Sequence, residues 1–395
     1  MAESASGAPG PAAEAGLVVG IVGGGQLGRM LVQAARELGV DCVTLDPEAN
    51  CPAAQAGASQ ITGSLFDADA LARLIEQSSV TTFEIESTDA DALARLEAAG
   101  NLIRPRPRTL KRIQNKLLQK EFLSANGIPT SPFEALETPS AGAVRRFGLP
   151  AVQKLQRGGY DGRGVLIIKS EEDLDDLLEG PSLVEEYVTT ARELAVVGAR
   201  AVDGDVRCYS VVDMTLGEST NMLEMLTAPA DVPAEVADAA LELGRRTIEA
   251  FDDVGVFAVE MFMTADYRLL VNEVSPRTHN SGHFTIDACV TSQFEQHIRA
   301  IAGMPLGDIR QIAPSAMINL LGDPGYAGLP VLEGEAEALA VSGVHIHLYG
   351  KRECRPHRKM GHVTVVDDTL EGAIEKAERV RGLLKIRGCE TIDAA

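Results

Sequence analysis

The feature that most constrains the fold is a regular alternation of apolar runs and amphipathic segments over roughly the first hundred residues. Apolar runs and segments with helical spacing follow one another at 16–23, 26–39, 40–46, 67–77, 80–86 and 89–100. Strands joined by short helical crossovers pair in parallel and are covered by helices on both faces. The sequence therefore begins with an expected α/β domain around a parallel sheet.

The glycine-rich turn after the first apolar run is a candidate phosphate site. Gly23, Gly25 and Gly28 satisfy G-x-G-x-x-G, in which backbone amides at a helix N-terminus bind an anion. Gly25 is expected where the chain passes closest to that anion. Asp46 follows Gly28 by 18 residues, near the expected position of a ribose-binding acid. These residues leave open whether the turn binds NAD or another phosphate.

Charge and composition narrow the range of partners. With 36 Lys and Arg against 57 Asp and Glu, the formal net charge is −21, which disfavours nucleic acid and anionic membranes. The chain has no apolar run of 18 residues, so no spanning helix is expected. Six scattered cysteines favour a reducing, cytoplasmic location. Residues 1–16 are unlike a signal peptide and are expected to form a disordered tail.

A basic stretch marks the first domain boundary. Residues 101–120 contain four Arg, three Lys and no acid, and their two prolines interrupt regular structure before a helix. Further on, the pattern predicts a helix at 171–180 and a hairpin that turns at Asp203–Gly204. The expected divisions are a domain at 17–110, one at 111–313 with a glycine-rich lid at about 140–215, and a β-rich one with a final helix at 314–395.

A second hairpin, at 255–277, carries two acids within apolar runs. If its turn centres between Asp266 and Tyr267, Glu260 lies opposite Glu273 with Cβ atoms about 4.5–5.5 Å apart. Two buried carboxylates so close need a cation between them. With Asn272 adjacent, the ligands suit Mg²⁺, or alternatively Mn²⁺. An exposed, solvated hairpin is the other interpretation, which the apolar flanks disfavour.

Two further segments are candidates for nucleotide binding. GGYDGRG at 158–164 can approach phosphate oxygens through its backbone and close as a lid, with Lys154 nearby, although an ordinary hairpin turn has the same composition. LVEEYV at 183–188 is expected as an edge strand whose backbone pairs with adenine, with Glu185 and Glu193 near the ribose. An acidic outward face is the alternative there.

The order of these segments is that of ATP-grasp enzymes, in which two α+β halves clasp a nucleotide. GGGQLGRM, GGYDGRG, NEVSPRTHNSGH and YGKRECRPHRKMGH together resemble the N5-carboxyaminoimidazole ribonucleotide synthases, from about Val18 to the C-terminal helix. The resemblance implies a mixed α/β and α+β architecture. It consists of an ATP-grasp fold, an N-terminal Rossmann-like parallel-sheet domain and a small C-terminal β-rich domain.

The resemblance also implies a reaction. ATP, bicarbonate and 5-aminoimidazole ribonucleotide would give the N5-carbamate, ADP and phosphate in a cytoplasmic homodimer. The reaction would pass through carboxyphosphate, and the exocyclic amine would capture either this intermediate or CO₂ released from it. It implies that the first glycine turn binds the substrate's ribose phosphate and that Glu260 and Glu273 bind the metal. Arg277, His279 and Lys351 are the implied catalytic residues, with Arg277 and His279 handling the carboxyphosphate and the amine proton.

The remaining implied contacts fall into two groups. The implied ATP-binding residues are Arg112, Lys154, Gly159, Tyr160, Asp161, Gly162, Arg163, Gly164, Val165, Glu185, Glu186, Tyr187, Val188, Glu193, Asp213, Asn272 and Glu273. The implied substrate-binding residues are Gln26, Leu27, Glu84, Tyr160, Arg163, Arg277, His279, Lys351 and Arg358.

Some residues depart from the family pattern, and rival functions stay open. Ser87 stands where Asn is usual, Asp213 and Met214 stand where Glu-Asn is frequent, and His357 stands where Gly is usual.

His345 and His347 alternate on one strand and are expected to be ordinary strand residues, since no third metal ligand is near in sequence. The rivals are an NAD(P)-dependent oxidoreductase, another ATP-grasp purine ligase and a silent ATP-binding protein.

Overall fold

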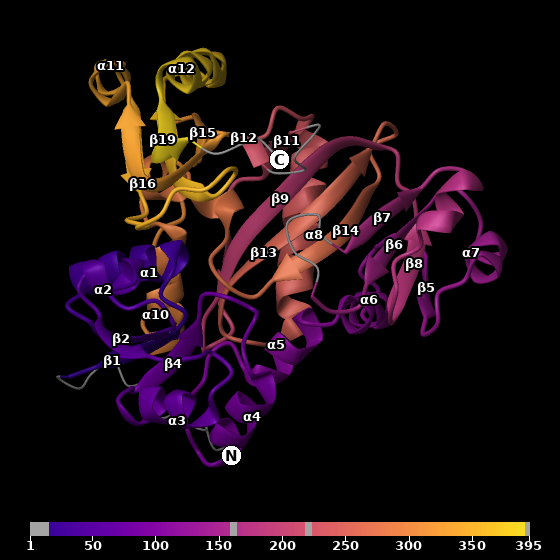
Figure 1. The fold of residues 1–395 in the computed structure, drawn as a ribbon, viewed down its shortest axis with the longest axis horizontal. Helices are drawn as coiled ribbons and strands as arrows, with labels where there is room; N and C mark the ends of the chain where they lie inside the picture. Colours follow the sequence, from indigo (N-terminus) through magenta and orange to yellow (C-terminus); the bar gives the residue numbers. More distant parts are fainter. Residues whose placement is uncertain (1–15, 159–163, 218–222, 392–395) are drawn as a thin grey trace, which may run out of the picture.

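The computed structural model describes residues 16–158, 164–217 and 223–391. The predicted tail at 1–16 lies almost wholly outside the described residues, and so do residues 159–163 of the predicted lid. Figure 1 shows the N-terminal domain below one end of a long central sheet, the lid at the other end, and the C-terminal segment above the N-terminal domain. Within the described residues, no helix has the length and apolarity needed to cross a membrane.

The predicted parallel sheet is present at the N-terminus. Its strand order is β3-β2-β1-β4, with every pairing parallel. The elements are β1 (Val18–Val22), α1 (Gln26–Glu37), β2 (Asp41–Asp46), α2 (Pro52–Gln55), β3 (Ser59–Thr62), α3 (Ala68–Glu76), β4 (Val80–Phe83) and α4 (Ala90–Ala98). Asp67 and Asp89 cap α3 and α4 by accepting hydrogen bonds from amides of the first turn.

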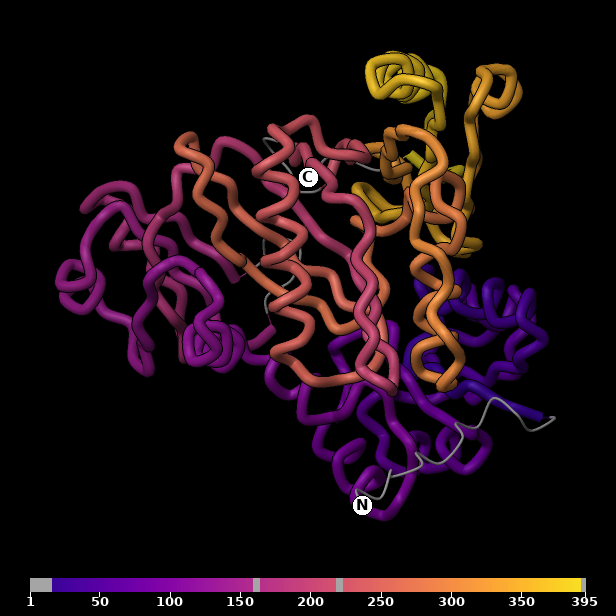
Figure 2. The backbone as a smooth tube through the Cα atoms, turned by 180° about the vertical axis from the view of Figure 1, so that it is seen from behind, coloured from indigo at the N-terminus to yellow at the C-terminus, as the bar shows by residue number. Residues whose placement is uncertain are grey.

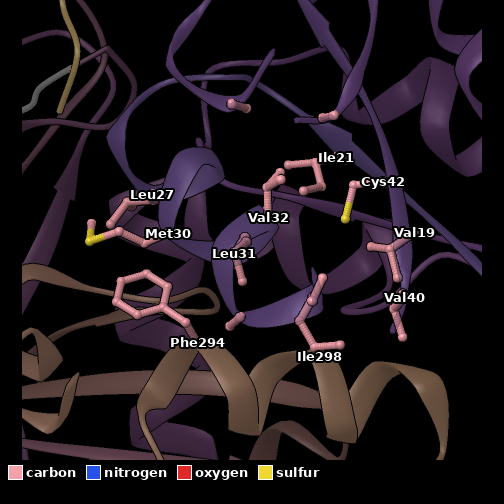
Figure 3. Close-up of a cluster of buried hydrophobic side chains, with 14 of the residues drawn as sticks. Val19, Ile21, Leu27, Met30, Leu31, Val32, Val40, Cys42, Phe294 and Ile298 are labelled. Carbon is pink, nitrogen blue, oxygen red and sulfur yellow. The ribbon is translucent and has the colours of Figure 1, made fainter. Parts of the chain in front are cut away.

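The core of this domain continues into the central domain. Leu27, Met30 and Leu31 of α1 belong to one apolar cluster with residues of α10 (Gln293–Ala302). Figure 3 shows Phe294 and Ile298 of α10 extending toward this face of α1. Because α10 also packs on the central strands, the cluster fixes the glycine turn relative to the rest of the molecule.

The basic boundary segment forms two helices rather than one. These are α5 (Pro107–Ile113) and α6 (Lys116–Ala125). Asn115 separates them and caps α6, because its side chain accepts a hydrogen bond from Leu118 N at 3.1 Å. Lys116 and Lys120 are four residues apart on α6, so they lie on the same face of the helix.

A buried acid attaches α5 to the central domain. Asp253 is 3% exposed, and its Oδ2 accepts hydrogen bonds from Arg106 N at 2.8 Å and from Thr109 Oγ1 at 2.6 Å. We expect Asp253→Ala to lower the free energy of unfolding by about 2–3 kcal/mol, since buried donors then lose a charged acceptor. Urea denaturation measures the change. Glu242→Ala, at an exposed ion pair on α8 (Ala234–Phe251), is the control. Equal losses in both variants would contradict this role.

Residues 133–186, which overlap the predicted lid at about 140–215 and are called the lid below, contain a small four-stranded sheet. Its order is β5-β8-β6-β7, all antiparallel. The elements are β5 (Phe133–Leu136), α7 (Ala141–Phe147), β6 (Ala151–Leu155), β7 (Val165–Ile168), the 3₁₀ turn η2 (Glu172–Asp176) and β8 (Ser182–Glu186). The helix predicted at 171–180 is therefore wrong. Its acid-rich sequence forms the short η2, and the Asp173 side chain accepts hydrogen bonds from Lys169 N and Ser170 N.

The central sheet runs through the rest of the molecule. Its order is β14-β13-β9-β11-β12-β15-β18-β17, with β10 paired to β9. The strands are β9 (Thr190–Arg200), β10 (Val206–Cys208), β11 (Val212–Leu216), β12 (Leu223–Ala228), β13 (Gly255–Thr264), β14 (Leu269–Ser275), β15 (Ser315–Leu321), β17 (Val344–Leu348) and β18 (Lys359–Val366). The hairpin predicted at Asp203–Gly204 is confirmed, since Arg200 pairs with Val206.

Helices cover one face of this sheet. Figure 2 shows the long helices α8 and α10 lying along its back, and both contact β9 and β13. The C-terminal segment extends the sheet through β15 and adds its own two-stranded sheet. Its further elements are β16 (Tyr326–Glu333), α11 (Glu335–Leu339), α12 (Leu370–Leu383) and β19 (Lys385–Thr391). The short elements η3 (Asn280–Gly282) and α9 (Thr285–Ala288) follow β14.

Candidate active site

The metal-candidate hairpin places its two acids opposite each other. Glu260 of β13 pairs with Glu273 of β14, so the opposition predicted from the sequence is confirmed. Nearer the turn Met261 pairs with Val271, which leaves Asn272 as the extra residue of a β-bulge. Consecutive strand residues normally point to opposite faces, but here Asn272 and Glu273 line the same small cavity.

The two acids have different surroundings. Burial raises the pKa of Glu260, and the carboxylates of Glu273 and Glu193 raise it further. The pKa of Glu273 is lowered, chiefly by Lys116, whose Nζ lies 3.0 Å from Glu273 Oε2. Nε2 of His279 lies 3.4 Å from Glu260 Oε1, but burial lowers the pKa of this histidine to about 3, so the ring is neutral. Within the described residues, the ammonium group of Lys116 therefore forms its ion pair with Glu273 and not with Glu260.

A second charged cluster joins the lid to the central sheet. Lys154 Nζ of β6 lies 2.5 Å from Glu185 Oε1 and 3.0 Å from Asn272 Oδ1. Lys120 Nζ of α6 lies 2.8 Å from Glu185 Oε2. Burial opposes the ionisation of Glu185, but the two ammonium groups outweigh it and lower its pKa to about 2. The cavity between the two sheets is lined by Lys116, Gln119, Lys120, Lys154, Leu183, Asn272 and Glu273.

The acidic strand β8 is not an edge strand, so that prediction is wrong. It lies between β5 and β6, and its backbone is paired on both sides. Glu185 is 2% exposed and faces two lysines, which favours a lysine-positioning role over the predicted ribose contact. Glu186 is exposed, and Tyr187 and Val188 follow the end of the strand. Their contacts with ATP stay predictions.

The structure gives most of the other implied ATP residues contacts within the protein. Glu193 of β9 lies near the Glu260–Glu273 pair. Burial raises its pKa, the charge of Lys154 lowers it, and the charge of Glu273 raises it. Asp213 of β11 forms an ion pair with Arg192. Arg112 lies with its guanidinium carbon 3.9 Å from the Phe122 ring centroid. Val165 begins β7 and Gly164 O accepts from Leu155 N, whereas Gly159, Tyr160, Asp161, Gly162 and Arg163 lie outside the described residues.

The glycine turn is engaged by the protein's own carboxylates. Gly25 N and Gly28 N donate to the two oxygens of Glu84 at 2.9 and 3.2 Å. Asp46 accepts from Gly24 N at 2.8 Å and from Glu48 N at 2.8 Å, so it is used within the loop. Among the first-turn amides that the structure describes, those of Gln26 and Leu27 are left for a phosphate. The predicted anion site thus has fewer available backbone amides than the glycine pattern indicates.

Arg277 lies where the N-terminal and central domains meet. Its Nε is 2.7 Å from Glu86 Oε1, just beyond β4, and its Nη1 donates to Thr278 O at 2.9 Å. His279 follows, and its Nδ1 accepts from Ser281 N at 3.3 Å, which assigns the ring proton to Nε2. The segment after β14 therefore brings a guanidinium and a neutral imidazole toward both the acid pair and the glycine turn.

The basic loop between β17 and β18 lies against the N-terminal domain. Gln55 Nε2 of α2 donates to Gly350 O at 3.0 Å. Burial and then Arg358 lower the pKa of the adjacent Lys351, whereas Glu84 raises it. Arg358 Nη1 donates to Glu353 O at 2.8 Å. His357, which stands where glycine is usual, has φ 61°, so the loop keeps its left-handed turn without glycine.

The two alternating histidines have a partner that the sequence did not reveal. His347 Nε2 lies 2.8 Å from Asp287 Oδ2, and His345 Nδ1 lies 3.5 Å from Asp287 Oδ1. The described residues nevertheless contain no group of three His, Cys, Asp or Glu side chains arranged to hold a metal ion. Both histidines lie on β17, as predicted, and His347 is hydrogen-bonded to Asp287 of α9.

Sequence reasoning missed Lys116, Lys120 and Glu86 as site residues. The two lysines lie in the basic boundary stretch, where their charge indicated a domain junction rather than a cavity. Their spacing of four residues was the available signal, because it predicts one shared helix face. Glu86 is the second acid of FEIES, and only its pairing with Arg277 shows its part in the site.

Comparison with protein families divides the chain into three matched regions. Residues 17–114 match a ribonucleotide synthetase preATP-grasp domain, 121–294 an ATP-grasp domain, and 315–376 a phosphoribosylaminoimidazole carboxylase C-terminal domain. The chain is 38% identical to N5-carboxyaminoimidazole ribonucleotide synthase of Synechococcus elongatus, covering 93% of each chain. It is 37% identical to the chloroplastic phosphoribosylaminoimidazole carboxylase of Vigna aconitifolia, where 90% of this chain spans 65% of that longer protein.

Solved structures give the same result for the fold. The N5-carboxyaminoimidazole ribonucleotide synthetase of Thermotoga maritima superposes with a TM-score of 0.88 at 45% identity, covering 94% of this chain and 99% of that one. The synthase of Aspergillus clavatus, solved with ADP and 5-aminoimidazole ribonucleotide, has a TM-score of 0.84 at 33% identity, covering 93% and 98%.

Proposed function

Because this chain belongs to the N5-carboxyaminoimidazole ribonucleotide synthase family, we propose that it carboxylates 5-aminoimidazole ribonucleotide with bicarbonate at the expense of ATP. The products are N5-carboxyaminoimidazole ribonucleotide, ADP and phosphate. The observation that carries the proposal is the half-buried, opposed pair of Glu260 and Glu273, with the ammonium groups of Lys116 and Lys154 beside it. Such a site binds a metal-bound polyphosphate, whose negative charge needs cations on several sides.

We assign Mg²⁺ to the acid pair. Two opposed carboxylates and the adjacent Asn272 amide are hard oxygen donors. Burial first, and then the carboxylates of Glu273 and Glu193, raise the pKa of Glu260, and a divalent cation would offset both effects. When bound, the metal would neutralise phosphate charge. Lys154, at the end of β6, and Lys116, at the start of α6, approach the same space from two directions and orient the terminal phosphate.

The reaction needs a second anion site for the ribonucleotide. In our proposal, Gln26 and Leu27 amides with Lys351 and Arg358 bind its phosphate, and Arg277 lies between this site and the acid pair. Attack of a bicarbonate oxygen on the γ-phosphorus breaks the bond to ADP and forms carboxyphosphate. The amine then attacks its carbonyl carbon, the bond from that carbon to the phosphate oxygen breaks, and the departing phosphate takes up the proton that the amine loses. Neutral His279 donates its Nε2–H, which suits stabilisation of the carboxyphosphate charge better than removal of the amine proton.

The rival NAD(P) oxidoreductase gives no role to the acid pair. Its candidate ribose acid, Asp46, already accepts two backbone hydrogen bonds within the loop. Release of ADP is the test: we expect it to require both bicarbonate and 5-aminoimidazole ribonucleotide, and to stop when either is omitted. Equal release with formate or glycine in place of bicarbonate would instead indicate another ATP-grasp ligase. We also propose a homodimer, to be measured by sedimentation.

The pH dependence of ribonucleotide binding follows from Lys351. Burial, with Arg358 as the next cause, lowers the pKa of Lys351 to about 8. The ammonium that attracts the phosphate is therefore lost as pH rises through this value. We expect KM for 5-aminoimidazole ribonucleotide to increase about tenfold for each pH unit above this pKa. Steady-state kinetics between pH 7 and 9.5 measure the effect.

The matched control is Lys351→Arg, because a guanidinium stays protonated over this range. Its KM profile should be flat, and a rise equal to that of the native chain would contradict the assignment. A loss of folding stability at high pH does not explain the rise in KM, because the titration of Lys351 changes stability in the opposite direction. Between pH 8 and 10.5 the unfolded lysine binds more protons than the folded one, so this residue adds stability as pH rises.

A further inference from the structure

We infer that Lys120 is a positioning residue, which sets the place and effective charge of Lys154 through the shared carboxylate of Glu185. This inference rests on the proposed nucleotide site and adds a member to it. Lys120 is 3% exposed and lies on α6, whereas Lys154 and Glu185 lie on neighbouring strands of the lid. The two lysines bind opposite oxygens of the one carboxylate.

The hydrogen bonds of Lys120 leave it no donor for a ligand. Its ammonium has three N–H groups, and Nζ lies 2.6 Å from Thr130 Oγ1, 2.8 Å from Ser131 Oγ and 2.8 Å from Glu185 Oε2. In the described part of the chain, by contrast, Lys154 has two acceptors, Glu185 and Asn272, for its three N–H groups. Lys154 is therefore the lysine that can donate to a phosphate.

The hydrogen bonds of Lys120 also connect the lid to β14, the strand that carries Asn272 and Glu273. Thr130 accepts from Lys120 and donates to Val271 O at 2.7 Å, immediately before the Asn272 bulge. Ser131 accepts from Lys120 and donates to Glu185 Oε2 at 3.0 Å. One ammonium thus fixes two hydroxyl groups whose other bonds hold β14 and β8. This arrangement keeps Lys154 and Asn272 in register across the gap between the two sheets.

Formal charge predicts how the cluster responds to substitution. Two ammonium groups and one carboxylate, those of Lys120, Lys154 and Glu185, sum to +1. In Lys120→Met the sum falls to zero. Glu185 then interacts with Lys154 alone, so less of the positive charge of Lys154 is available to a phosphate. In the double variant Lys120→Met/Glu185→Gln the sum is again +1, and Lys154 is free to turn to the ligand.

Titration of MgADP into the folded chain tests the inference. We expect Lys120→Met to raise Kd about tenfold. The double variant with Glu185→Gln should return to within about threefold of the native value. On a Lys154→Met background, Lys120→Met should change Kd little further. Lys111→Met, at an exposed pair with Asp91, is the surface control and should bind normally.

A merely structural Lys120 gives a different pattern. The double variant would then bind as weakly as Lys120→Met or more weakly, and this result would overturn the inference. Circular dichroism checks folding, and Lys120→Gln, which keeps a neutral donor, replaces Lys120→Met if that variant unfolds. The proposed function fails separately, through absence of bicarbonate-dependent turnover in the native chain, whereas MgADP affinity reports on Lys120 in either case.

Discussion

We expect replacement of Glu273 by glutamine to lower kcat/KM for ATP by about 10²-fold or more while the chain stays folded. Glu273 is one of two carboxylates assigned to Mg²⁺ and is the partner of Lys116 at 3.0 Å. The variant loses a charged metal ligand and frees Lys116 to move. Its folding stability should change little, because the lost attraction to Lys116 is offset by relief of the repulsion from Glu260.

Steady-state rates at several Mg²⁺ concentrations measure this effect. Excess Mg²⁺ should restore part of the activity, as expected when affinity for the metal has fallen. Glu390→Gln on β19 is the matched control, since this acid is exposed and belongs to the two-stranded C-terminal sheet. Normal turnover of Glu273→Gln at ordinary Mg²⁺ would disprove the metal assignment.

We expect Gly25→Val to raise KM for 5-aminoimidazole ribonucleotide by about tenfold or more, with little change in KM for ATP. The cause is not backbone strain, because Gly25 has φ −72°. A Cβ at Gly25 would lie 2.8 Å from Glu84 Oε1, so the carboxylate must leave the amides of Gly25 and Gly28. The first turn of α1 then loses the acceptor that holds its free amides toward the ligand.

The matched control is Gly382→Val on α12, where an added Cβ meets no atom within 4 Å. It should leave both KM values unchanged. If Gly25→Val instead raises KM for ATP and spares the ribonucleotide, the two ligands do not occupy separate domains and the assignment of the glycine turn is wrong. Circular dichroism must first show that the variant is folded.

The sequence predicts local elements well because their causes are local. The turn at Asp203–Gly204 and the opposition of Glu260 to Glu273 each depend on a few neighbouring residues. The bulge at Asn272 could not be predicted in this way. It becomes visible only through the contacts of β14 with α6 and the 129–131 segment, where Val271 N donates to Pro129 O and Val274 N donates to Gln119 Oε1.

The position of a strand within its sheet was the main error. Nothing in the segment LVEEYV distinguishes an edge strand from an interior one. The pairing of β8 with β5 shows that β8 is interior. The roles of Lys120 and Glu86 were missed for a related reason. Each charge is balanced by a partner far along the chain, Glu185 for Lys120 and Arg277 for Glu86, and a single sequence carries no signal for such pairs.

In the proposed reaction, bicarbonate attacks ATP and its carbon is then transferred to the ribonucleotide amine. Turnover with ¹⁸O-labelled bicarbonate tests it most directly, because the attacking oxygen stays on phosphorus when carboxyphosphate breaks down. Mass spectrometry should find one ¹⁸O in each phosphate released, and labelled carboxylate in the ribonucleotide product. Phosphate without label, formed while ADP is released, would show that water or another nucleophile attacks ATP and would contradict the account.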